Sequence, residues 1–223
     1  MHTDIDSDRI SSLLSRISFG ILGAGALALA AALPTFPARW ATHFDHTGNP
    51  NQWTDRSWMH AAFPLFLGLF VIGLTQGIQA VVKKTGSPER LPLVFGATFR
   101  FVSLLQCALA FAFVVMSFAL PLGASQLWII LTPLVLVVAA VILGGAWVQR
   151  AMEKERVGGN AQLLEGYHGL YYAKKEDPRL WVPKLAGMGW TINFAHRWAW
   201  PMMLALLSPA IVGVGVALLA AAR

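Results

Sequence analysis

The sequence PARWATHFDHTGNPNQWTDRSW, residues 37–58, separates two apolar segments that are each long enough to cross a bilayer. A connection between two membrane spans needs only enough polar residues to turn. This connection instead mixes polar side chains with aromatic ones: His43, Asp45, His46, Asn49, Asn51 and Asp55 among Trp40, Phe44, Trp53 and Trp58. We therefore expect it to form a folded or ligand-bound structure.

The composition identifies a membrane protein. Of the 223 residues, 56% are hydrophobic and only 13% are charged, outside the usual range of soluble domains. A helix crosses the hydrocarbon core with about 20 apolar residues, and five stretches qualify: roughly 17–36, 61–82, 99–120, 127–148 and 198–222. Because the bilayer offers the backbone no hydrogen-bond partners, each stretch must be helical. The sequence predicts an all-α, polytopic transmembrane helix bundle with about five spans.

Positive charge predicts the orientation of this bundle. Of the 17 Lys and Arg residues, all but Arg39, Arg56 and Arg223 lie before span one, around the connection between spans two and three, or between spans four and five. Cytoplasmic loops retain positive charge, so we expect a cytoplasmic amino terminus and an extracytoplasmic 37–58 connection. The net charge of +6 does not indicate nucleic-acid binding, since the basic residues are spread along membrane-adjacent segments and fit contact with anionic lipid.

Four regions follow from this pattern. Residues 1–98 form an amino-terminal module of two spans plus the connection, 99–148 a central helical hairpin, 149–197 a cytoplasmic or interfacial aromatic-basic segment, and 198–223 the final span. Within the third region, a charged extension of span four is expected to end at Gly158 and Gly159. Trp and Tyr favour the membrane interface, and the residues expected to contact lipid or a partner there are Trp181, Lys184, Trp190, Asn193 and His196.

Small and polar residues within the spans predict how the helices pack. Gly73 and Gly77 form a GxxxG pattern that permits close helix approach; packing within the chain is favoured over a dimer interface. Gln76, Gln79 and Gln106 are expected to face the bundle interior. No charged residue is expected deep within a span, which argues against proton or ion coupling.

The histidines of the connection allow two interpretations. His43, His46 and Asp45, with His60 nearby, are suitable zinc or copper ligands. The same segment contains Gly48, Asn49 and Pro50, which are typical turn residues. We favour structural or ligand-contact roles, with no metal and no cofactor. The predicted ligand-binding residues are His43, Phe44, Asp45, His46, Asn49 and Trp53.

Catalysis has less support in the sequence. HExxH, GxSxG and phosphate-binding glycine loops are all missing. A hydrolytic pair of Asp45 with His43 or His46 is the weaker alternative. We expect no catalytic residue and no enzymatic activity.

Two groups of residues resemble known families. Leu33-Pro34, the run Thr42 to Asp45, and then Gly48, Asn49 and Trp53 resemble the amino-terminal module of the bacterial SdpI-like membrane proteins. The segment DPRLWVPK, residues 177–184, followed by Gly187, Gly189-Trp190-Thr191 and Asn193-Phe194, is similar to a carboxyl-terminal module of unknown function that accompanies the first in some relatives.

The SdpI-like resemblance implies a location in the bacterial inner membrane and a binding function. The member that names the family is an immunity protein, which protects against a secreted toxin peptide and holds a transcriptional repressor at the membrane. By resemblance, the exterior connection would meet a peptide or envelope ligand, and the cytoplasmic face would meet lipid or a protein partner. The carboxyl half of this chain differs from that of the immunity protein.

Three other function classes stay open. The chain is alternatively a small-molecule transporter or lipid flippase, an accessory or structural subunit of a larger membrane complex, or a membrane enzyme. The expected partners are the lipid bilayer and a peptide ligand or a membrane-complex subunit. A homo-oligomer is left open, and nucleic acid is not expected.

Overall fold

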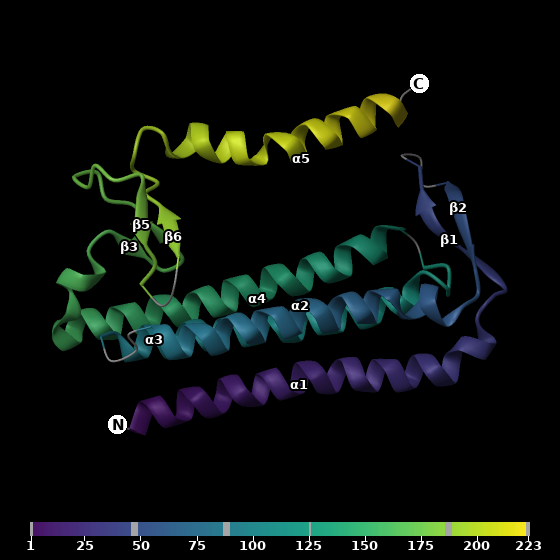
Figure 1. Ribbon diagram of the computed structural model, residues 1–223, viewed down its shortest axis with the longest axis horizontal. Helices are drawn as coiled ribbons and strands as arrows, with labels where there is room; N and C mark the ends of the chain where they lie inside the picture. The colour runs from purple at the N-terminus through teal and green to yellow at the C-terminus, as the bar shows by residue number, and fades with distance from the viewer. Residues whose placement is uncertain (1, 46–48, 87–89, 125, 186–188, 222–223) are drawn as a thin grey trace.

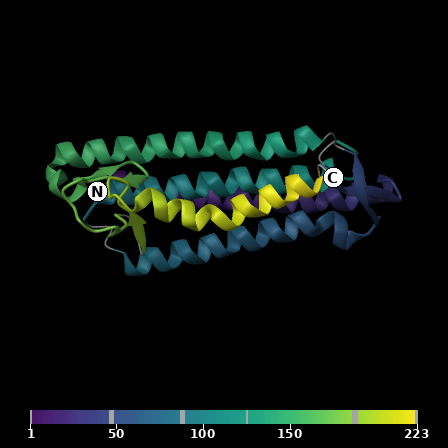
Figure 2. The ribbon, with the colours of Figure 1, turned by 90° about the horizontal axis from the view of Figure 1, so that it is seen from above.

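The computed structural model describes residues 2–45, 49–86, 90–124, 126–185 and 189–221. Within these residues, four long helices lie side by side (Figures 1 and 2): α1 (His2–Ala32), α2 (Trp58–Thr85), α3 (Pro92–Ala119) and α4 (Gln126–Glu155). Helix α3 is central, since it contacts each of the other three. All four are long and apolar enough to cross a membrane. The predicted helical membrane bundle is confirmed.

Helix α5 (Ala199–Ala221) supplies the fifth apolar helix. It is apolar over Ala199–Pro209. In Figure 1 it leaves the end of the molecule where α1 begins and runs back toward the other end. The cytoplasmic location of the amino terminus stays a prediction.

Short strands form at both ends of the bundle. After a 3-10 turn, η1 (Leu33–Thr35), strands β1 (Arg39–Phe44) and β2 (Pro50–Asp55) pair as an antiparallel hairpin between α1 and α2. Beyond α4, and at the opposite end in Figure 1, lie β3 (Tyr167–His168), β4 (Tyr171–Tyr172), β5 (Trp181–Pro183) and β6 (Trp190–Ile192). We call residues 161–198 the aromatic module. The all-α prediction holds for the apolar helices, but it missed these strands.

Each end of the bundle has its own apolar cluster. The cluster at the hairpin end includes Leu29, Phe36, Trp40 and Ile72, all buried. The cluster at the other end includes Met152 of α4 and Leu164 of η3 (Gln162–Leu164), both fully buried. Both small folds are therefore attached to the helices through buried apolar contacts.

Polar side chains join three helices between these clusters. The Gln76 amide donates to Ser15 Oγ at 2.6 Å and to Gln106 Oε1 at 2.7 Å, and the Gln106 amide donates to Thr75 Oγ1 at 2.7 Å. These bonds link α1, α2 and α3, and they confirm that Gln76 and Gln106 face the bundle interior. Gln79 is buried as well, at 8% exposure.

The prediction that Gly73 and Gly77 allow another helix of this chain to approach closely is wrong. Gly73 and Gly77 are exposed, and a Cβ built at either would meet no described atom within 4 Å. The close approaches occur elsewhere: a Cβ on Gly144 of α4 would overlap the Phe101 ring of α3, and a Cβ on Gly68 would lie 2.8 Å from Phe113 Cδ2. The spacing correctly placed the two glycines on one face of α2, but among the described residues no other helix packs against that face.

Helix α3 begins about two turns earlier than the sequence indicated. Pro92 takes one of its first positions, where the missing backbone N–H costs no hydrogen bond. Arg100 therefore lies within the helix and not at its edge.

Replacing Gly144 with alanine should destabilise the bundle. The added methyl group overlaps the Phe101 ring, and overpacking of this kind costs about 1–3 kcal/mol. Thermal unfolding of the purified protein in one detergent measures the effect, as a lower midpoint. Gly73→Ala is the matched control, because its methyl group meets open space and alanine favours helix by up to about 1 kcal/mol. Equal midpoints for the two variants would contradict this packing.

Candidate functional site

The β1–β2 hairpin has a rigid base. Trp40 is 4% exposed and packs edge-to-face on Phe36, which makes the same contact with Phe118 of α3. Arg56 donates from Nη1 to the carbonyl oxygens of Pro34 (2.7 Å) and Phe36 (2.8 Å), and its backbone N–H bonds to Ala38 O. Sequence reasoning assigned Arg56 no role. Its bonds fix the hairpin to the end of α1.

A second set of contacts fixes the hairpin to α2. Ser57 is the N-cap of α2, and its hydroxyl accepts from the backbone N–H of His60. Nδ1 of His60 lies 2.6 Å from Thr54 Oγ1 and 2.9 Å from Ser57 Oγ. His60 therefore holds β2 against the start of the helix.

One face of the hairpin is presented outward. Trp40 pairs with Thr54 on the face that leads to the bundle, and Ala41 pairs with Trp53 on the other. Trp53 is 53% exposed. Along the hairpin, Trp53 lies between two polar pairs: Arg39 forms a 3.1 Å ion pair with Asp55, and His43 Nδ1 lies 2.6 Å from Asn51 Oδ1. The pairing register shifts on both sides of His43, so strand alternation assigns a face only as far as the Ala41–Trp53 pair. We call this the Trp53 face: an aromatic side chain between two polar pairs.

The other predicted binding residues have different positions. The Asp45 carboxylate accepts from the backbone N–H of Asn49 at 2.9 Å and so joins the end of β1 to the start of β2. His46 and the side chain of Phe44 lie outside the described part of the chain. Among the residues described, no group of three or more His, Cys, Asp and Glu is placed to hold a metal ion. Of the predicted residues that the structure describes, Trp53 lies on this face, and His43 belongs to one of the two polar pairs beside it along the hairpin.

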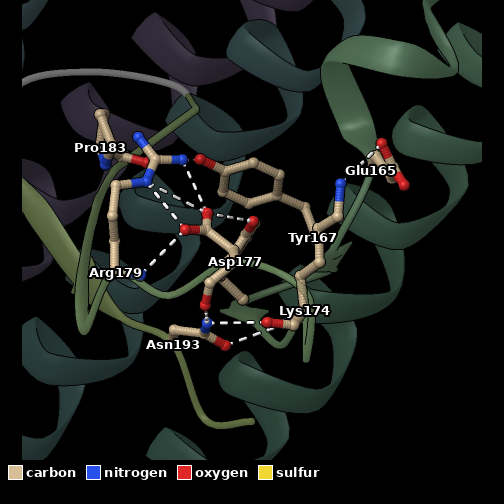
Figure 3. A network of polar contacts seen from close by, with 8 residues as sticks. Glu165, Tyr167, Lys174, Asp177, Arg179, Pro183 and Asn193 are labelled. Atoms are coloured by element: carbon tan, nitrogen blue, oxygen red, sulfur yellow. Dashed lines mark hydrogen bonds and ion pairs between the residues drawn. The ribbon is translucent and has the colours of Figure 1, made fainter. Parts of the chain in front are cut away.

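The aromatic module is organised around a buried asparagine. Asn193 is fully buried, and its amide donates to the carbonyl oxygens of Lys174 (2.8 Å) and Asp177 (3.0 Å) (Figure 3). Its Oδ1 accepts from the backbone N–H groups of Lys174 and Ala195. The predicted partner contact at Asn193 is therefore wrong, because the side chain is used to join the two halves of the module.

Asp177 forms the charged part of the same network. Its carboxylate accepts from Arg179 Nε, Arg179 Nη2 (2.7 Å) and the Tyr172 hydroxyl (2.8 Å). These bonds, led by those from Arg179, hold the pKa of Asp177 well below its ordinary value of 3.8. Burial, and then the bond to Asp177, raise the pKa of Tyr172 to about 12. The module is thus stabilised by a mostly buried carboxylate in its ionised form.

Aromatic side chains remain on the outside of the module. Trp181 is 44% exposed, Trp190 is 61% exposed, and Lys184 is also exposed. His196 is half-buried, and its Nδ1 accepts from the backbone N–H of Trp198 just before α5. A mostly apolar cavity of about 210 Å³ lies between part of the module and helices α3 and α4, with Lys184 among its lining residues. Trp181, Trp190 and Lys184 therefore remain available for a lipid or protein partner.

Residues 20–68 match a domain of unknown function, DUF1648, and residues 175–200 match a family of unknown function, DUF5808. The first match spans the carboxyl-terminal part of α1, the hairpin and the start of α2; the second spans β5, β6 and the start of α5. No curated protein and no solved structure matches the chain.

These matches support part of the resemblance seen in the sequence. The two segments that carry the resemblance, between residues 33 and 53 and between residues 177 and 194, lie within these matches, and both families are of unknown function. Neither match covers half of the chain. The specific likeness to the SdpI immunity protein stays a prediction.

Asp177→Asn should destabilise the aromatic module and change its response to acid. A folded-state pKa below 3.8 means that the stabilisation is complete above about pH 4 and is lost as the pH falls below that value. Loss of charge-assisted hydrogen bonds should cost about 1.5–3 kcal/mol at pH 7. Limited proteolysis of the module in the purified protein, at pH 7 and pH 3, measures both effects.

Glu176→Gln is the control for that experiment, since Glu176 is the exposed neighbour of Asp177. We expect its cleavage rate to match wild type at pH 7 and to rise at pH 3 as in wild type. Asp177→Asn should instead be cleaved fast at pH 7, with a smaller further rise at pH 3. An Asp177→Asn protein that resists cleavage as wild type does at pH 7 would show that the network is not needed.

Proposed function

We propose that this chain is a non-enzymatic, SdpI-like protein of the bacterial inner membrane that recognises an extracytoplasmic peptide or envelope ligand through the Trp53 face. In the cell, ligand binding would serve immunity or sensing, the role that the resemblance implies. The observation that most supports this proposal is the exposure of Trp53. Its side chain is 53% exposed, on a hairpin whose base is held in place by Trp40 and Arg56.

The composition of the Trp53 face suits peptide recognition. Binding surfaces commonly combine a central aromatic residue with a polar rim, and Trp is enriched among the residues that dominate affinity. Here the rim consists of the His43–Asn51 and Arg39–Asp55 pairs. Within the described residues the sheet has two strands, so its outer edges also offer backbone groups to an extended peptide.

The rigid base of the hairpin should increase its affinity for a ligand, because the hairpin loses less conformational freedom on binding. Ordering a mobile loop costs conformational entropy when a ligand binds, and a preorganised site avoids part of that cost. Arg56, Trp40 and His60 hold the hairpin before any ligand arrives.

The bundle interior gives less support to the transporter alternative. Gln76 and Gln106 are the polar groups expected to line a path, and they bond to each other and to Ser15 and Thr75. An accessory-subunit role is favoured by one observation, the exposed Trp181 and Trp190 of the aromatic module. That role is compatible with ligand binding at the opposite end.

Trp53→Ala should weaken peptide binding strongly. Peptides would be selected from a phage-displayed library on the full chain in lipid nanodiscs, with empty nanodiscs as competitor. A buried aromatic anchor is worth about 2 kcal/mol or more, so we expect at least about a 30-fold rise in Kd for Trp53→Ala. Yield and elution volume should stay as in wild type, because the side chain is exposed.

Trp58→Ala is the matched control, since Trp58 is equally exposed at 53% but lies at the start of α2. Its Kd should stay within about threefold of wild type, below a 1 kcal/mol change. Failure to enrich any peptide over empty nanodiscs, or equal binding by wild type and Trp53→Ala, would contradict the proposal.

A further inference from the structure

A basic groove runs between α3 and α4 at the end of the bundle that bears the aromatic module. Its described lining consists of Leu93, Arg100, Trp147, Arg150, Ala151 and Lys154, and its volume is about 160 Å³. Arg150 and Lys154 lie four residues apart, so they share a face of α4. Three cationic side chains thus border one small space, and none of the described residues that line it is acidic.

Arg100 is the cation that α3 contributes, and it lies further from the end of its helix than Arg150 and Lys154 do. It lies about 12 Å along the helix axis from Pro92, at 1.5 Å of rise per residue. Its Nε atom is buried and has no hydrogen-bond partner among the described residues. A buried donor without an acceptor is costly, and more so when it belongs to a charged group.

Glu155, the residue after Lys154, does not neutralise the groove. Its Oε1 accepts from the backbone N–H of Leu93 at 2.8 Å, and its Oε2 accepts from the Asn160 amide at 2.7 Å. Glu155 is 5% exposed and serves to hold the start of α3 to the end of α4. Among the described residues, no carboxylate forms an ion pair with these three cations.

We propose that this groove binds the phosphate headgroup of an anionic phospholipid. The groove opens between two membrane-spanning helices, so the anion that reaches it most readily is a lipid headgroup, and basic pockets between such helices are suited to this chemistry. Arg100 would pair with the phosphate from within, with Arg150 and Lys154 at the other wall. Trp147, one turn further into α4 than Arg150, would lie beside the glycerol and upper acyl chain.

Native mass spectrometry of the full chain tests this assignment. Phosphatidylglycerol and phosphatidylcholine would each be titrated into the detergent-solubilised protein. Arg150→Gln/Lys154→Gln should bind phosphatidylglycerol at least fivefold more weakly than wild type, with phosphatidylcholine binding unchanged. Equal binding of phosphatidylglycerol by both proteins would overturn the proposal.

The matched control removes two charges outside the groove. Lys84→Gln/Lys175→Gln alters two exposed lysines of α2 and the aromatic module, and its phosphatidylglycerol affinity should stay within twofold of wild type. An equal loss in this control would mean that net charge alone attracts the lipid. Glycerol phosphate at millimolar concentration should not displace the lipid; full displacement would indicate a site for a soluble phosphate and overturn the lipid assignment.

A second measurement needs no substitution in the groove. A photoactivatable phosphatidylglycerol, with the reactive group near the headgroup, would be added to the wild-type protein and the labelled peptides identified. We expect labels within residues 93–100 and 147–154. Labelling confined to other helices would overturn the proposal, even if the groove variants fail to fold.

Discussion

The hydrocarbon core of the bilayer offers a protein no hydrogen-bond partners, and this constraint shapes every level of the structure. Long helices satisfy the backbone within the membrane. Gln76, Gln106, Thr75 and Ser15 satisfy one another where α1, α2 and α3 meet. Larger polar networks lie at the two ends of the bundle, in the hairpin and the aromatic module.

The two ends are built on the same physical plan. An apolar cluster joins each small fold to the helices, through Trp40 at the hairpin and Leu164 at the module. Polar bonds then fix its shape. At the hairpin Arg56 bonds to two carbonyl oxygens, and in the module the buried side chain of Asn193 bonds to the backbone of Asp177. Exposed tryptophans remain on the outside of both. Such a plan suits binding, since a rigid support presents side chains that gain contacts only with a partner.

The sequence predicted the membrane part well. Both the length of the apolar helices and the inward position of Gln76 and Gln106 follow from the lack of hydrogen-bond partners in the hydrocarbon core. Gly158 and Gly159 also marked the helix end correctly: α4 ends at Glu155, and Gly159 has a φ of 103° that favours glycine. The predictions that were wrong concern residues whose role depends on their neighbours in the folded chain. The role of Asn193 depends on Lys174 and Asp177, and the glycine contacts depend on which face of α2 meets another helix. Pro92 was a readable signal for the start of α3 that sequence reasoning did not use.

Ligand recognition outside the cell requires the hairpin and the aromatic module to lie on opposite sides of the membrane, with the hairpin exterior. Cysteine labelling tests this most directly, using Gln52→Cys on β2 and Lys175→Cys in the module, each combined with Cys107→Ser. A membrane-impermeant maleimide should label Gln52→Cys in intact cells, or in spheroplasts if an outer membrane is present, and Lys175→Cys only after lysis. Labelling of Lys175→Cys before lysis, or of both positions on one side, would contradict the account.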